Sequence, residues 1–115
     1  MKILFLLNDA PYGSDKNFNA LRTAIQLQKH EPNNKVWVYL MSDSVIGALP
    51  GQKEKTGQYN IGQMLVTIVQ QGGEVKLCTS CAESRGATAV IPGAVLGTLT
   101  DLTNWIVNAD KSLVF

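Results

Sequence analysis

Two cysteines in the segment Cys78-Thr79-Ser80-Cys81 offer this chain its widest choice of chemistry. A thiolate can transfer sulfur as a nucleophile, be oxidised to a disulfide or bind a metal ion, whereas a buried thiol is simply a small apolar group. The pair directly follows a short β-type run, Glu74–Leu77, and lies near the start of a predicted helix. Unpaired backbone N–H groups at a helix start favour negative charge, so this position favours the thiolate of Cys78.

The neighbouring side chains predict different environments for the two thiols. Thr79 and Ser80 can add hydroxyl donors, whereas Arg85, seven residues after Cys78, is expected to act only weakly through solvent. Cys81 is predicted inside the first helical turn and is expected to be buried. Cys81 is therefore either a resolving thiol, which would attack a modified Cys78 and close a disulfide, or a small apolar residue of the core.

Metal binding is not expected. A structural zinc site needs four ligands, and the chain contains two cysteines and one histidine, His30. His30 ends a predicted helix about 22 Å long, which places it at the opposite edge of the fold from Cys78. No other cofactor is predicted. The Cys-x-x-Cys spacing also fits a thioredoxin-like motif, but its flanking aromatic and proline residues and the closing β-hairpin are missing.

Length and composition indicate one globular domain. The chain has 115 residues, of which 45% are hydrophobic and 17% charged, and these are values typical of a single folded core. The net charge of +1 gives no electrostatic argument for nucleic-acid binding. The apolar run at the N-terminus is too short for a membrane span or a signal peptide. We therefore expect a cytoplasmic protein whose thiols stay reduced.

Strand-like runs alternate with helical patterns, which predicts an α/β fold with a parallel sheet and helices on both faces. Strands are expected at Lys2–Asn8, Val36–Met41, Glu74–Leu77, Ala94–Gly97 and Ser112–Phe115. Thr100 is expected to cap the last helix. Loops that follow parallel strands meet at one edge of the sheet. The candidate pocket residues from these loops are Asp9, Ala10, Pro11, Tyr12, Asp43, Gln52, Tyr59, Thr79, Ser80 and Arg85.

Several motifs occur in an order that resembles the DsrE/DsrF family of small sulfur-handling proteins, in particular its YchN-type branch. The motifs are Ala10-Pro11-Tyr12-Gly13-Ser14, Phe18-Asn19-Ala20-Leu21-Arg22, Leu40-Met41-Ser42-Asp43, Gly51-Gln52-Lys53, Tyr59-Asn60-Ile61, Val75-Lys76-Leu77-Cys78 with Cys81 and Arg85-Gly86, Gly97-Thr98-Leu99 and Ala109-Asp110-Lys111. The resemblance extends over nearly the whole chain.

The resemblance implies a three-layer α/β/α fold with a five-stranded parallel sheet. It also implies a homo-oligomer, either a ring-like trimer or a hexamer of two trimers. In sulfur-relay relatives, a cysteine at the position of Cys78 accepts a persulfide sulfur and passes it on, which implies sulfur donor and acceptor proteins as partners. Cys81 is not general among these relatives, so the implied role covers Cys78 alone.

The leading hypothesis is a cytoplasmic persulfide carrier or sulfurtransferase-like subunit in which Cys78 is the nucleophile. A neighbouring subunit is expected to complete the pocket, and the sequence leaves open whether the protein turns over as an enzyme. One alternative is a dithiol redox sensor that uses Cys78 and Cys81. The other is an oligomeric binding module without catalysis.

Overall fold

A five-stranded parallel sheet forms the centre of the computed structural model, which describes residues 1–53 and 60–115. The strand order is β4-β3-β2-β1-β5, and every paired strand is parallel to its neighbour. The strands are β1 (Lys2–Leu7), β2 (Lys35–Leu40), β3 (Glu74–Cys78), β4 (Ala94–Gly97) and β5 (Lys111–Val114). This arrangement confirms the predicted α/β fold. The candidate pocket residue Tyr59 lies outside the described residues.

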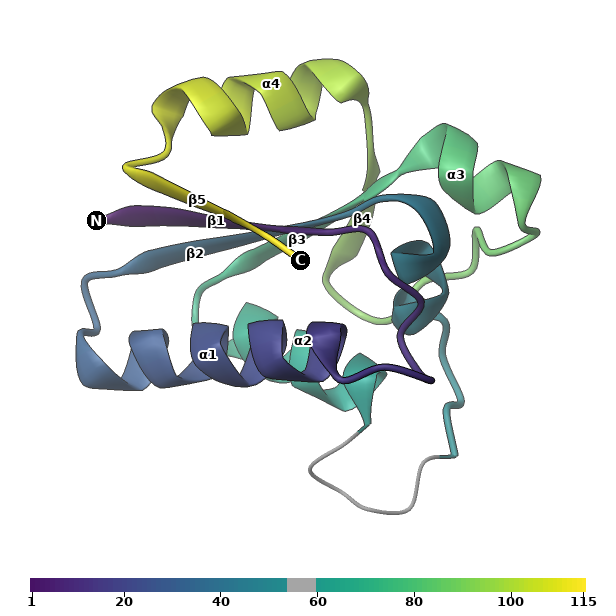
Figure 1. Ribbon diagram of the computed structural model, residues 1–115, viewed down its shortest axis with the longest axis horizontal. Coiled ribbons are helices and arrows are strands. Elements are labelled where there is room, and N and C mark those ends of the chain that lie inside the picture. The colour runs from purple at the N-terminus through teal and green to yellow at the C-terminus, as the bar shows by residue number, and fades with distance from the viewer. Residues whose placement is uncertain (54–59) are drawn as a thin grey trace.

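Helices cover both faces of the sheet and make the three layers visible in Figure 1. The helices are α1 (Lys16–His30), the 3₁₀ helix η1 (Ser42–Ala48), α2 (Ile61–Gln70), α3 (Thr79–Ser84) and α4 (Leu99–Asn108). The chain adds β2, β3 and β4 in one direction and then returns to place β5 beside β1. Because parallel crossovers are right-handed, this reversal sends α4 across the face opposite α1 and α2.

The two faces of the sheet carry unequal cores. Alternate residues of the strands pack against α1 and α2 in the larger cluster: Ile3, Phe5, Leu7, Val36, Val38, Leu40, Val75 and Leu77. The smaller cluster under α4 consists of Leu4, Trp37, Tyr39, Leu102 and Trp105, with Cys78 packed against it. Cys78, the last residue of β3, therefore lies on the face of the sheet that has the smaller core.

Aromatic stacking attaches α4 to the sheet. The Trp105 ring stacks on Trp37 with centroids 5.2 Å apart and an interplanar angle of 4°. It also meets Tyr39 edge to face, with centroids 6.1 Å apart. Such pairs contribute about 0.5–1.5 kcal/mol beyond the burial of their area. The large ring of Trp105 thus gives α4 the apolar contact with the sheet that most helices obtain from a longer stripe of apolar residues.

The start of α4 differs from the expected one, because its N-cap is Thr98 and not Thr100. Asp101 N–H donates to Thr98 Oγ1 at 3.1 Å, and Thr98 N–H donates to Asp101 Oδ2 at 2.8 Å. This reciprocal capping box satisfies two backbone donors at once. A cap at Thr100 would place Thr103, which lacks a carboxylate, at the third helical position, so the Thr98 box is the better start.

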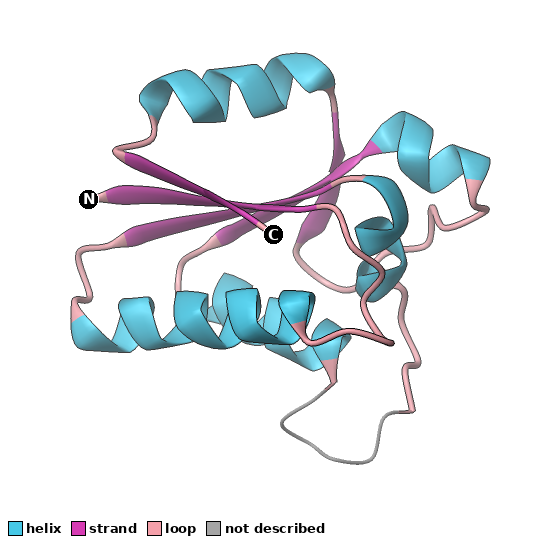
Figure 2. Ribbon diagram, in the orientation of Figure 1, coloured by secondary structure: helices cyan, strands magenta, loops and turns pink. Residues whose placement is uncertain are grey.

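The strand ends and loops that follow them meet at the right of Figure 2, where η1 and α3 pack together. This is the edge at which the sequence predicted the loops after β1, β2 and β3 to converge. Within residues 1–53 and 60–115, no helix combines the length and the apolar character that a bilayer crossing requires.

Replacing Trp105 by Ala is expected to lower the free energy of unfolding by about 3–5 kcal/mol, because it removes the main contact between α4 and the sheet. Val107→Ala on the same helix is the matched control, since Val107 is 81% exposed and its loss should change stability by less than about 0.5 kcal/mol. Urea denaturation measures both values. Equal, small losses in the two variants would contradict this role of Trp105.

Candidate active-site cysteine

Cys78 is the last residue of β3 and also the N-cap of α3. Its Sγ accepts a hydrogen bond from the backbone N–H of Cys81 at 3.3 Å. Ser80 Oγ lies 3.3 Å from the same sulfur. An N-cap side chain normally offers a hydroxyl or carboxylate oxygen to the free N–H groups of the first turn. Here a sulfur atom has that position, and a thiolate is a better acceptor than a thiol.

Hydrogen bonding decides the acidity of Cys78. Burial opposes the thiolate, but the hydrogen bonds from Cys81 and Ser80 outweigh it and hold the pKa of Cys78 below its usual value. A lower pKa means more thiolate at neutral pH, and the thiolate is the nucleophilic form. The favourable effect that the sequence predicted at the start of α3 is therefore present in the geometry.

Cys81 has the opposite protonation preference. Burial and the hydrogen bond to Cys78 raise the pKa of the Cys81 thiol, although a hydrogen bond from Ser42 N–H and the charge of Arg85 act against this rise. Cys81 is half-buried, as is Cys78, and it packs against the large core rather than the small one. The expectation that Cys81 is buried was therefore wrong, because Ala82 takes the inward position of α3.

A cavity of about 320 Å³ opens beside both thiols. It is lined by the ends of β2, β3 and β4 and by the start of α4: Tyr39, Met41, Cys78, Thr79, Ser80, Cys81, Gly97, Thr98 and Leu99. The candidate residues Thr79 and Ser80 are thus brought to the cysteines as predicted. Thr79 Oγ1 also donates to Gly97 O at 2.6 Å, which ties the cysteine segment to β4.

Tyr39 lines the cavity but is not among the pocket residues expected from the sequence. Its hydroxyl donates to Thr98 O at 2.7 Å. Burial, followed by the negative charge of Cys78 and Asp101, raises the pKa of Tyr39 to about 12. The hydroxyl therefore stays protonated at neutral pH and cannot serve as a base. Tyr39 comes to the cavity because it pairs in register with Lys76, two residues before Cys78, and this pairing has no signal in the local sequence.

Arg85, at the end of α3, makes direct contacts with η1 and with the backbone of α3. Its Nε donates to Asp43 Oδ1 at 2.9 Å, and its Nη1 donates to Cys81 O at 3.2 Å. Arg85 is not among the groups that lower the pKa of Cys78, and its charge acts on Cys81 instead. The ion pair fixes α3 to the start of η1. Neither Arg85 nor Asp43 lines the cavity.

The backbone at Ser42 has an unusual conformation beside this ion pair. Its φ of 53° lies in the left-handed region, where residues other than glycine are uncommon. This conformation lets the chain turn sharply from β2 into η1. The turn brings Ser42 N–H towards Cys81 and places Asp43 against Arg85.

Two other candidate pocket residues, Tyr12 and Gln52, form a separate hydrogen-bonded cluster at the start of α2. The Tyr12 hydroxyl donates to Gln52 Oε1 and accepts from Ile61 N–H at 3.1 Å. Gln52 Oε1 also accepts from Gly62 N–H at 3.2 Å. These contacts satisfy free backbone donors of α2. Neither residue lines the cysteine cavity.

The start of the β1–α1 loop also stays apart from the thiols. Asp9 forms an ion pair with Lys16 at 3.4 Å, and its carbonyl accepts from Asn17 Nδ2 at 3.0 Å. Ala10 is exposed, and Pro11 is buried against the region of Gly47. The structure therefore brings together the loops after β2, β3 and β4 around the cavity, and it leaves the loop after β1 to support α1 and α2.

The cavity is lined by two thiols and by residues that carry hydroxyl groups. Among the described residues, no three histidine, cysteine, aspartate or glutamate side chains gather closely enough to hold a metal ion. Two neighbouring thiols that line one cavity can support nucleophilic attack by a thiolate and disulfide formation.

Comparison with known proteins agrees with this architecture. A model of the DsrE/DsrF-like family matches residues 1–115. Protein YchN of Escherichia coli K12 is 46% identical over 99% of this chain and 98% of its own length. An uncharacterised protein of Methanopyrus kandleri is 31% identical over 98% of this chain and 93% of its own.

Solved structures lead to the same family. The crystal structure of the E. coli YchN protein superposes with a TM-score of 0.94 at 45% identity, and the match covers 100% of this chain and 99% of that one. A Bacteroides thetaiotaomicron protein of unknown function has a TM-score of 0.73 at 20% identity, covering 99% of this chain and 94% of that one, and so shares the fold. With a whole-chain family match and close similarity to YchN, the chain belongs to the DsrE/DsrF-like family.

Proposed function

We propose that this protein carries sulfur as a persulfide on Cys78. The observation that carries the proposal is the position of Cys78 Sγ, which accepts the Cys81 N–H at 3.3 Å and faces a cavity of about 320 Å³. The first feature favours the thiolate, and the second leaves room for an added sulfur atom and for the group that delivers it. The family is associated with sulfur relay, which supports the same assignment.

The transfer needs no external oxidant. The Cys78 thiolate attacks the outer sulfur of a donor persulfide, R–S–SH, so that a new S–S bond forms and the donor S–S bond breaks. The donor leaves as the thiolate R–S⁻, and Cys78 becomes Cys78–S–SH. An acceptor thiolate then attacks the outer sulfur, and Cys78 leaves as a thiolate. Its lowered pKa favours this second step, because a more acidic thiol is the better leaving group.

The surroundings of Cys78 suit a persulfide that must survive until an acceptor arrives. Tyr39, Met41 and Leu99 contribute apolar surface to the cavity wall, and a neighbouring subunit that covers Leu99 would limit the access of water. Ser80 and the Cys81 N–H remain the hydrogen-bond donors near the sulfur. These donors can stabilise either the resting thiolate or an anionic persulfide.

A homo-oligomer, either a trimer or a hexamer of two trimers, is part of the proposal. Apolar side chains near the cavity support it, since Leu99 is 66% exposed and Val95 is 54% exposed. A neighbouring subunit would cover these residues and complete the pocket. Light scattering of the purified chain is expected to give a mass three or six times that of one chain, and a monomer would contradict this part of the proposal.

A dithiol redox reaction is the second candidate, and the contact between the two thiols favours it. If a peroxide oxidises Cys78 to a sulfenic acid, the Cys81 thiol can attack its sulfur, with loss of water and formation of a disulfide. Both cysteines lie within one helical turn and line the same cavity. This reaction predicts a reversible loss of two hydrogens under mild oxidant and no stable persulfide.

Incubation with a low-molecular-weight persulfide is expected to add the mass of one sulfur atom to the intact protein. Cys78→Ser should abolish the adduct, because it removes the attacking thiolate, whereas Cys81→Ser should retain it. Intact-mass spectrometry followed by peptide mapping measures both. An adduct of equal yield in Cys78→Ser, or no adduct in the wild-type protein, would refute the carrier proposal.

The pH dependence of alkylation provides a second test. A lowered pKa keeps Cys78 ionised at lower pH, so iodoacetamide should modify it with a midpoint below the value of about 8.5 for a free cysteine, and Cys81 should react only at higher pH. Ser80→Ala removes one hydrogen bond to the sulfur and should move the Cys78 midpoint upwards. Ser84→Ala on the same helix is the control, since Ser84 bonds Cys81 O instead. Equal midpoints for the two cysteines would contradict the assignment.

A further inference from the structure

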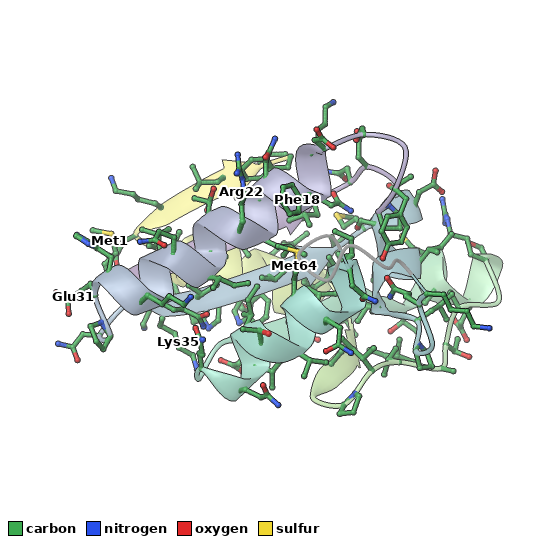
Figure 3. The ribbon with its side chains drawn as sticks, turned by 90° about the horizontal axis from the view of Figure 1, so that it is seen from below. Met1, Phe18, Arg22, Glu31, Lys35 and Met64 are labelled. Carbon is green, nitrogen blue, oxygen red and sulfur yellow. The ribbon has the colours of Figure 1, made fainter. Side chains whose placement is uncertain are left out.

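A groove runs between α1 and α2 on the side of these helices that faces away from the sheet (Figure 3). Its volume is about 420 Å³, and it is lined by Phe18, Arg22, Ile25, Gln26, Lys29, Gln63, Met64 and Thr67. The residues from α1 follow one helical stripe over three turns, which corresponds to a groove about 16 Å long. This surface lies across the sheet from the small core that contacts Cys78 and has no part in the function proposed above.

The floor of the groove is apolar. Met64 is buried and Phe18 and Ile25 are half-buried, so each presents part of its side chain to the groove. Figure 3 shows Phe18 on α1 and Met64 on α2 on either side of the hollow. An open groove with a floor of this kind fits the apolar stripe of a helix better than a small enclosed ligand.

The rim of the groove is cationic. Arg22 and Lys29 are both exposed and stand two helical turns apart, about 10 Å along the axis. The Arg22 guanidinium lies 5.3 Å from the centroid of the Phe18 ring, so its charge is held over the groove. Arg22 also lines a second hollow on the surface of α1.

No acidic side chain offsets this charge from the helices themselves. The sequence of α1 contains no aspartate or glutamate, and that of α2 contains no charged residue. Among residues 1–53 and 60–115, the ion pairs within 4.0 Å involve Lys16, Lys35, Lys76 and Arg85. The described carboxylates therefore leave Arg22 and Lys29 available to an external acid.

We propose that this groove docks an acidic amphipathic helix of a partner protein. The apolar stripe of that helix would lie on Ile25 and Met64, and two carboxylates two turns apart would pair with Arg22 and Lys29. Spacing and charge both match, since residues seven apart on a helix are also about 10 Å apart. A second copy of the chain fits poorly, because among its described helices η1, α3 and α4 each contain a single carboxylate and α1 and α2 contain none.

A synthetic helix tests the proposal. The probe is a fluorescein-labelled peptide of about 15 residues, acetylated and amidated, with leucines along one face and two glutamates two turns apart beside that face. Fluorescence anisotropy with the full-length protein is expected to show binding that weakens as salt is raised. Arg22→Glu and Lys29→Glu should each weaken binding about tenfold, since an attraction becomes a repulsion. Lys111→Glu, on exposed strand β5, is the matched control.

Exchanging the charges of the peptide and of the groove distinguishes specific docking from nonspecific binding. A peptide with lysines in place of the two glutamates should not bind the wild-type protein and should bind the double variant R22E/K29E, provided that circular dichroism shows native helix content. No binding of the acidic peptide, or an equal effect of Lys111→Glu, would overturn the proposal. So would a change in oligomer mass in R22E/K29E, because the groove would then be an interface between copies of this chain.

Discussion

The position of Cys78 at the junction of β3 and α3 constrains the rest of the candidate site. As the last strand residue, it is held in register beside Gly97 of β4. As the helix N-cap, it must direct its side chain to the free N–H groups of α3, and its Sγ accepts the Cys81 N–H at 3.3 Å. One side chain thus satisfies a backbone donor and keeps its own pKa low. Any change that moves β3 relative to α3 would alter both effects together.

The strand order explains why this sulfur has open space beside it. Since β5 returns to the far side of β1, α4 is the one helix among the described residues that packs on the face of the sheet that carries Cys78. The aromatic stack of Trp105 on Trp37 holds α4 to this face, while the Thr98–Asp101 capping box fixes where α4 begins. Between these two anchors and the end of β3 lies the cavity. On the opposite face, α1 and α2, with residues of η1 and α3, cover a larger continuous core.

The architecture could be predicted from sequence because its signals are local and periodic. The uninterrupted apolar run of β1 and the spacing of Met64, Leu65 and Ile68 in α2 are patterns that a buried strand and an amphipathic helix require. The convergence of loops at the carboxyl edge followed from the parallel sheet alone. The N-cap of α4 was predicted at Thr100 and lies at Thr98. Both residues are threonines, and the carboxylate of Asp101, three residues after Thr98, is what distinguishes them.

The candidate site was less predictable, because its composition depends on which strands are neighbours and on how side chains fold back. Tyr39 reaches the cavity through its register with Lys76, and register between strands far apart in sequence carries no local signal. Tyr12 and Gln52 belong to loops at the correct edge, yet they satisfy the first turn of α2 instead. Arg85 reaches Asp43 where the chain turns with a left-handed backbone at Ser42, and no glycine marks this turn in the sequence.

The two faces of the sheet carry different surface features. The α4 face carries a cavity beside Cys78, whose pKa is lowered, and the α1–α2 face carries a groove with Arg22 and Lys29 on its rim. Sulfur carriage by Cys78 is tested most directly in protein taken from cells lysed into an alkylating agent, followed by the mass of the Cys78 peptide. Sulfur carriage predicts a fraction of Cys78 that bears an additional, alkylated sulfur atom. A Cys78 found only as the alkylated thiol or as a disulfide with Cys81 would contradict it.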